Sequence, residues 1–322
     1  MSLSRFVQSP LNVKLTGMLP VGLARCCTQL LGWIYFLRNP KIARDVMVGF
    51  SHSAGKEWPG RISMRVYARI FLGILEHYFE KLLMAYNPIE KTQDMLRAKC
   101  DVPDESWLRT LGPGQRGGMM LTGHFGAVEF LPLALALRGY RNAVILRYAT
   151  PHLKKAHEHL ERAVYPAIRL IDADEGLLRH RAIEALAEGR ILITACDEFK
   201  KWRPQPGHFV TVFGRQVLRD NSLDAFYDRV GAPVSLGVML RENGRYSLEI
   251  TPLADGKEAV SLSCRAWGEL EKYIQRYPEQ WYQWAKVRDL LSLKKDHAHA
   301  NRQDLDLPAG DSVQPGGHPQ PS

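Results

Sequence analysis

Apolar residues recur at helical spacing along the N-terminal third of the chain. Between Arg61 and Tyr86 they return every three or four positions, with cations on the other side. A second apolar stretch, Met18–Leu37, has about the length of a bilayer span but contains Pro20 and Arg25, and an arginine near mid-span is costly. We predict two amphipathic helices, the first an anchor at a membrane surface or, as the alternative, a single span. A core-packing role is equally open for the second.

After the glycine-rich loop at 112–118, short apolar runs alternate with helix-length segments. The predicted strands are Met119–Thr122, Ala143–Arg147, Ile168–Ile171, Ile191–Ala195, Val234–Leu240 and Tyr246–Ile250. Helices are predicted at Gly176–Glu188 and Ser222–Val230. This order predicts an α/β fold with a mainly parallel sheet flanked by helices. Asn243-Gly244 between the last two runs predicts a hairpin, and hence an antiparallel edge.

The same patterns divide the chain into three parts. Residues 1–110 form an amphipathic helical region for membrane association, and residues 111–294 form an α/β catalytic domain. Residues 295–322 have few large apolar side chains and many Pro and Gly, which predicts a disordered tail.

The distribution of charge and the number of cysteines indicate where in the cell the protein acts. Residues 1–72 hold ten Lys or Arg and two acidic residues, which gives +8 of the chain's net charge of +9. Because large apolar residues lie between these cations, an anionic membrane surface is favoured over nucleic acid. The five cysteines are odd in number and lack metal-ligand spacing, so we expect no disulfide, no metal and a reducing cytoplasmic setting.

The strand Met119–Thr122 leads directly to the residues best suited to chemistry. His124 follows its carboxyl end, where parallel α/β sheets usually bind ligands. Glu129 comes five residues later and can hold one imidazole nitrogen, which would make His124 a general base. The amides that open the next helix could stabilise an oxyanion. The alternative is a buried structural histidine, with Glu129 placed favourably in the helix dipole.

The sequence LTGHFGAVEFLPLALALRG at 121–139 resembles the signature of the lipid A biosynthesis late acyltransferases, which are related to the mycobacterial phosphatidylinositol mannoside acyltransferases. Three further stretches follow in that family's order: VILRYATPHLKKAHEHLERA at 144–163, EALAEGRILITACDE at 184–198 and VTVFGRQVLRDNSLDAFYDRVGAPVSLGVMLRENGRY at 210–246. Pro278-Glu279-Gln280-Trp281 resembles its closing motif. The resemblance spans roughly residues 110–290.

The resemblance implies an O-acyltransferase at the cytoplasmic face of a bacterial inner membrane. It would move a fatty acyl chain from acyl carrier protein, or from CoA, to a hydroxyl of a lipid A precursor or other glycolipid, and no cofactor is expected. His124 would be the base, with Glu129 orienting it. Arg147 would contact phosphate or the oxyanion, unless it forms a salt bridge at the sheet edge. Asp197 or Glu198 would supply a second carboxylate, with a helix cap or loop ion pair as the alternative.

Departures from the family pattern leave the acceptor open. Glu198 stands where the family usually has Gln, and the closing motif continues Trp-Tyr-Gln-Trp-Ala-Lys instead of His-Arg-Arg. A lysophospholipid acceptor, a thioesterase and a catalytically silent membrane-binding module are the alternatives. Among the other reactive side chains, Cys196 is expected to pack in the core, and His157 and Arg219 to lie on solvated surfaces.

Overall fold

The computed structural model describes residues 3–54, 63–102, 108–109, 117–148, 151–198, 202–254, 260–287 and 290. The predicted disordered tail, residues 295–322, lies outside this part of the chain.

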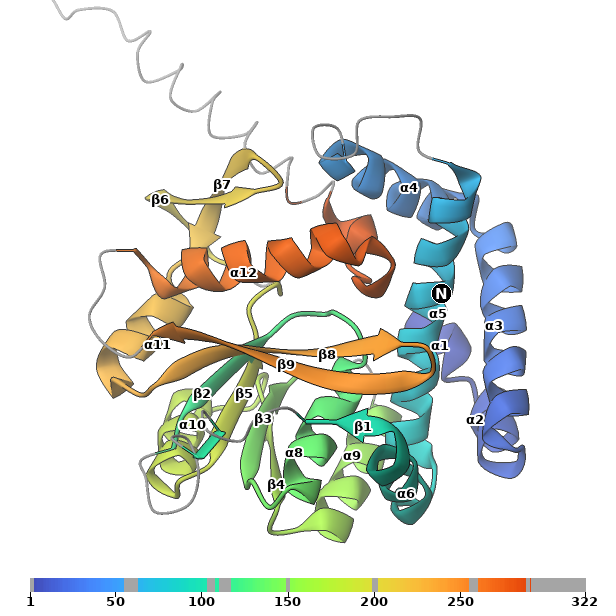
Figure 1. Ribbon diagram of the computed structural model, residues 1–322, viewed down its shortest axis with the longest axis horizontal. Coiled ribbons are helices and arrows are strands. Elements are labelled where there is room, and N and C mark those ends of the chain that lie inside the picture. The colour runs from blue at the N-terminus through green and yellow to red at the C-terminus, as the bar shows by residue number, and fades with distance from the viewer. Residues whose placement is uncertain are drawn as a thin grey trace, which may run out of the picture.

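A seven-stranded sheet forms the centre of the protein, in the order β1-β9-β8-β2-β5-β3-β4 (Figure 1). Its strands are β1 (Cys100–Asp101), β2 (Met119–Thr122), β3 (Asn142–Leu146), β4 (Ile168–Asp172), β5 (Ile191–Ala195), β8 (Val234–Glu242) and β9 (Arg245–Ala254). All neighbouring strands pair in parallel except β8 and β9. The α/β prediction is therefore confirmed, including the hairpin at Asn243-Gly244. The short strand β1, which the sequence analysis missed, pairs with β9 at that edge.

Helices surround the sheet. Those of the N-terminal region are α1 (Leu3–Val7), α2 (Pro10–Met18), α3 (Val21–Arg38), α4 (Pro40–Ala54), α5 (Met64–Tyr86) and α6 (Ile89–Lys99). Later come α8 (Leu131–Leu137), α9 (Pro151–Val164), α10 (Leu178–Ala187), α11 (Ser222–Val230) and α12 (Leu262–Arg276), with the 3₁₀ turns η1 (Val128–Phe130) and η3 (Pro278–Gln280).

The pleat of the strands divides the core into two layers. Met119 and Leu121 of β2 belong to one apolar cluster, together with α10 and α12. Met120, on the opposite face of the same strand, belongs to the other cluster, with α8 and α9. Since both faces of the central strands are covered, these strands are apolar throughout, which is why the sequence shows them as short continuous runs.

Helix α5 closes the carboxyl edge of the parallel strands (Figure 1). Twelve of its residues are buried, from Ile70 to Met84, and they contribute to both core clusters. The structure therefore shows the core-packing role that the sequence had left open for this helix. Two of its buried residues are acidic, Glu76 and Glu80. Glu80 Oε1 lies 2.6 Å from Arg241 Nε of β8, and burial raises the pKa of this carboxyl to about 8. Arg241 Nη2 also donates to the carbonyl oxygen of Gly126 at 2.7 Å, so Arg241 joins α5 to the loop after β2.

Helix α3 packs one face on α5 and leaves the opposite face open. The inner contact includes an ion pair between Arg25 Nη2 and Glu76 Oε2 at 2.5 Å. The outer face carries Leu23, Leu30 and Leu37, all exposed and spaced by seven residues. None of the described helices combines the length and the sustained hydropathy needed to cross a bilayer.

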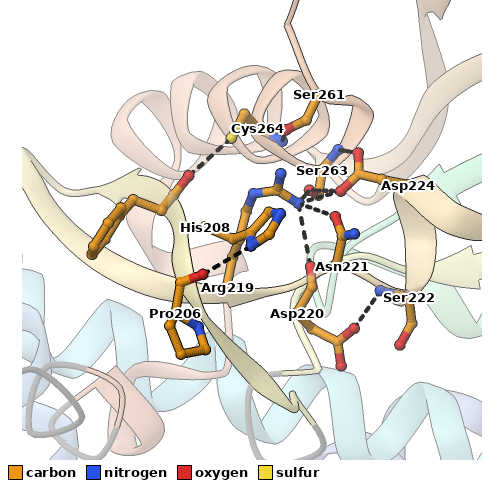
Figure 2. A network of polar contacts seen from close by, with 11 residues as sticks. Pro206, His208, Arg219, Asp220, Asn221, Ser222, Asp224, Ser261, Ser263 and Cys264 are labelled. Atoms are coloured by element: carbon orange, nitrogen blue, oxygen red, sulfur yellow. Dashed lines mark hydrogen bonds and ion pairs between the residues drawn. The ribbon is translucent and has the colours of Figure 1, made fainter. Parts of the chain in front are cut away.

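A small antiparallel hairpin of β6 (Pro204–Val212) and β7 (Arg215–Asp220) was also missed by the sequence analysis. At its end Arg219 is buried rather than solvated, which corrects the expectation for this residue. Figure 2 shows its guanidinium paired with Asp224 of α11, with Asn221 Oδ1 at 3.1 Å and Ser263 Oγ at 2.9 Å. The network joins β7, α11 and α12 and holds the Arg219 guanidinium in place.

Replacing Arg241 with Met should destabilise the protein by about 3 kcal/mol, because Glu80 would stay buried without its partner. The free energy of unfolding from denaturant titration measures this, with Lys272→Met, in an exposed pair with Glu269, as the control. The double variant Arg241→Met, Glu80→Leu should recover part of the loss. A loss no larger than that of Lys272→Met would show that the buried pair does not support the fold.

Candidate active site

Two glycines fix the loop that follows β2. A Cβ on Gly123 would lie 2.6 Å from Leu270 Cδ2, and one on Gly126 would lie 1.9 Å from the carbonyl oxygen of Met239. Gly126 also has a φ of +58°, which an L side chain rarely adopts. The chain therefore needs glycine at both positions to bring His124, which lies between them, against the sheet edge.

The carboxylate of Asp197, at the end of β5, organises this loop. Oδ1 lies 2.7 Å from His124 Nδ1, and Oδ2 accepts from the backbone N–H of His124 at 2.8 Å. Trp281 Nε1 donates to the same Oδ2 at 2.8 Å. Since Asp197 is completely buried and a carboxylate only accepts, Nδ1 of the imidazole carries its proton and Nε2 is the nitrogen available for chemistry. The predicted contact between Asp197 and His124 is therefore present in the structure.

Glu198 occupies the other side of the imidazole. Its Oε2 lies 3.3 Å from His124 Nε2, and its Oε1 lies 3.7 Å from Lys286 Nζ. Burial alone would lower the pKa of His124, but Asp197 and Glu198 outweigh it and raise that pKa to about 9. Burial likewise opposes ionisation of Glu198, but His124 and Lys286 lower its pKa to about 2. At rest the imidazole is therefore protonated and paired, and Glu198 occupies the position next to Nε2.

Glu129 does not occupy the position expected for it. Its Oε1 lies 3.4 Å from Lys81 Nζ and 3.8 Å from His77 Nε2, both on α5. The orienting role assigned to Glu129 is filled by Asp197, because the turn η1 begins at Val128 and directs Glu129 towards α5. Glu129 still lines the same pocket as His124.

The structure also bears on two expectations about anion stabilisation. The amides of Gly126 and Ala127, just before η1, donate to Gln280 O and Met239 O, each at 2.8 Å, and so are not free for an oxyanion. Arg147 lines the pocket, but its Nε donates to Asp174 Oδ1 at 3.0 Å. The salt bridge at the sheet edge, considered as an alternative for Arg147, is therefore present.

A cavity of about 350 Å³ opens beside His124. Its polar lining comes from His77, Lys81, Glu129, Arg147, Glu198 and Lys286. Its apolar lining includes Met84, Val144, Leu160, Ile168, Leu170 and Ile193, from α5, α9 and the sheet. The size and the mixed lining are those of a ligand site.

His157 and Cys196 complete the surroundings. His157 is buried and lines the cavity, which corrects its assignment to a solvated face; burial lowers its pKa to about 4, so it is neutral at pH 7. Burial, with the nearby charge of Asp197, raises the pKa of Cys196 well above its ordinary value, so this thiol stays protonated. A thiol in that state does not serve as a nucleophile.

Tyr282 is a site residue that the sequence reasoning did not single out. Its ring stacks on His77 at 3.5 Å between centroids and meets His124 edge-on at 5.3 Å. Its backbone N–H donates to His124 O at 3.2 Å. In the sequence, Tyr282 is marked only by its position directly after the Pro-Glu-Gln-Trp motif. That position does not reveal that its ring packs against His124.

Comparison with models of known protein families gives no match, and no curated protein is significantly similar to the chain.

Replacing Glu198 with Gln should lower the pKa of His124 from about 9 towards its ordinary value, because the carboxylate that stabilises the imidazolium becomes a neutral amide. NMR titration of ¹⁵N-labelled histidine measures the change. Glu269→Gln, which removes an exposed carboxylate paired with Lys272, is the matched control. An unchanged pKa in Glu198→Gln would show that Glu198 does not interact with the ring in solution.

Proposed function

We propose that the protein is an O-acyltransferase that moves a fatty acyl group from a thioester donor to a hydroxyl of a lipid at a membrane surface. The observation that carries the proposal is the position of His124. Asp197 holds its Nδ1, and His124 lines a cavity whose walls include apolar side chains from α5, α9 and the sheet. A base beside apolar cavity walls suits a reaction in which an alkyl chain must be held while a hydroxyl loses its proton.

The transfer proceeds by direct attack. When the acceptor hydroxyl displaces Glu198, the imidazolium loses the carboxylate that stabilised it and releases its Nε2 proton to solvent. Neutral His124 then takes the proton of the hydroxyl as the oxygen forms a bond to the thioester carbon. The carbonyl electron pair moves to its oxygen and gives a tetrahedral oxyanion. The pair then returns, the C–S bond breaks, and the imidazolium protonates the departing thiolate. Asp197 stabilises that imidazolium and fixes its orientation.

The donor is acyl carrier protein or CoA, both of which present an acyl thioester. The leading acceptor is a lipid A precursor or related glycolipid, as the resemblance of residues 110–290 implies. This chemistry belongs to the cytoplasmic face of a bacterial inner membrane, where both substrates meet. The polar residues at the cavity, Arg147 and Lys286 among them, suit an anionic lipid headgroup.

The outer face of α3 supports the membrane location. Leu23, Leu30 and Leu37 lie exposed along it, and Met18 is exposed just before the helix. Lys14 of α2 and Arg38 at the end of α3 are exposed cations of the same N-terminal region. Apolar side chains flanked by cations are typical of helices that rest in the interface of an anionic bilayer.

His124→Ala should reduce transfer of radiolabelled acyl groups by at least about 100-fold, because the general base is lost. The assay pairs acyl carrier protein and CoA thioesters with a panel of lipid A precursors and lysolipids, so that it also identifies the acceptor. His159→Ala, on the exposed face of α9, is the control and should leave transfer unchanged. Equal transfer by His124→Ala and wild type would contradict the mechanism. Thioester cleavage without dependence on any acceptor would indicate a thioesterase.

Leu30→Glu should weaken binding to vesicles of anionic phospholipid about tenfold or more, because it replaces an inserted apolar side chain with a charge. Vesicle co-sedimentation measures the affinity. Leu177→Glu changes an equally exposed leucine away from α3 and should bind as wild type does. The same loss in both variants, or in neither, would exclude α3 as the membrane-binding face.

A further inference from the structure

Four buried polar atoms at the cavity have no hydrogen-bond partner within the described part of the chain. They are His77 Nδ1, Thr122 Oγ1, His157 Nδ1 and Gln283 Nε2. A hydroxyl, or a neutral imidazole nitrogen in the right tautomer, can satisfy either a donor or an acceptor. The amide nitrogen of Gln283 can only donate. Because burying such a group without an acceptor costs free energy, Gln283 is suited to a ligand oxygen.

The backbone holds Gln283 beside the catalytic loop. Trp281 forms an antiparallel bridge with Phe125, and the N–H of Tyr282 donates to His124 O at 3.2 Å. The N–H of Lys286 then donates to Gln283 O at 2.8 Å and closes a turn. Gln283 is 1% exposed and lines the same cavity as His124. It is therefore a fixed group, as a preorganised donor must be.

The proposed reaction requires such a donor, and several groups near His124 already have acceptors. The backbone N–H of His124 donates to Asp197, while those of Gly126 and Ala127 donate to carbonyl oxygens. Arg147 is held by Asp174. Two carboxylates, Asp197 and Glu198, surround the imidazole and would oppose a new negative charge. A donor from a different segment would therefore favour an oxyanion formed here.

We propose that Gln283 is a catalytic residue that donates its Nε2 hydrogen to the thioester oxygen as that oxygen becomes negative. This role rests on the proposed acyl transfer. When the acceptor oxygen bonds to the carbonyl carbon, the C=O pair moves to the oxygen and the Gln283 hydrogen bond strengthens. It weakens again when the pair returns and the thiolate leaves. Gln283 gives up no proton in either step.

Kinetics of Gln283→Leu test this role. The variant should lose about 100-fold or more in kcat, with little change in the KM of either substrate and with the wild-type pH dependence, since the base is intact. Ser235→Ala removes a different buried polar group, a hydroxyl without a hydrogen-bond partner among the described residues; Ser235 lies outside the cavity lining, so the variant should retain wild-type kcat. A rise in KM with kcat unchanged would overturn the proposal, because Gln283 would then contact only the ground state.

Binding of an inert probe separates this inference from the proposed function. Calorimetry compares dodecylphosphonate monomethyl ester, a tetrahedral anion, with methyl dodecanoate, a neutral ester of equal chain length. Gln283→Leu should weaken binding of the phosphonate about 100-fold relative to the ester. Equal weakening of both probes, or binding of neither by the wild type, would overturn the assignment of Gln283. If the phosphonate preference holds while acyl transfer to every lipid fails, Gln283 keeps its role and the proposed acceptor class is wrong.

Discussion

The buried carboxylate of Asp197 is the group on which the arrangement of the site depends. It accepts from the backbone and ring of His124 and from the indole of Trp281, and so joins the ends of β2 and β5 to the closing segment. A completely buried carboxylate without these donors would be strongly disfavoured. His124 and the fold around it are therefore stabilised by the same three hydrogen bonds.

A second layer of charges sets the electrostatics of the cavity. Glu198 and Lys286 cover His124 on its open side, while Glu129, Lys81 and His77 form a separate cluster on the α5 side. The first set keeps the resting imidazole protonated, so the proposed reaction would begin with a substrate that displaces Glu198. α5 contributes to both the core and the cavity wall, so the N-terminal region helps to build the candidate site.

Much of the fold could be predicted from the sequence, because strands buried on both faces appear as short apolar runs and Asn243-Gly244 marks a hairpin. His124 and Asp197 could be placed at one sheet edge for the same reason. The partner of His124 could not be chosen: Glu129 is near it in sequence, but the turn at Val128–Phe130 directs that side chain to α5. His157 and Arg219 were expected on solvated surfaces but are buried. Charge and spacing in the sequence do not reveal which helix or hairpin covers a side chain.

The most direct test of the central claim compares Asp197→Asn with Glu129→Gln in the same acyl-transfer assay, with folding checked by thermal unfolding. If Asp197 is the residue that holds and charge-balances His124, Asp197→Asn should lower kcat by about 100-fold or more, and Glu129→Gln should cost much less. The reverse order, with Asp197→Asn active and Glu129→Gln inactive, would contradict the account.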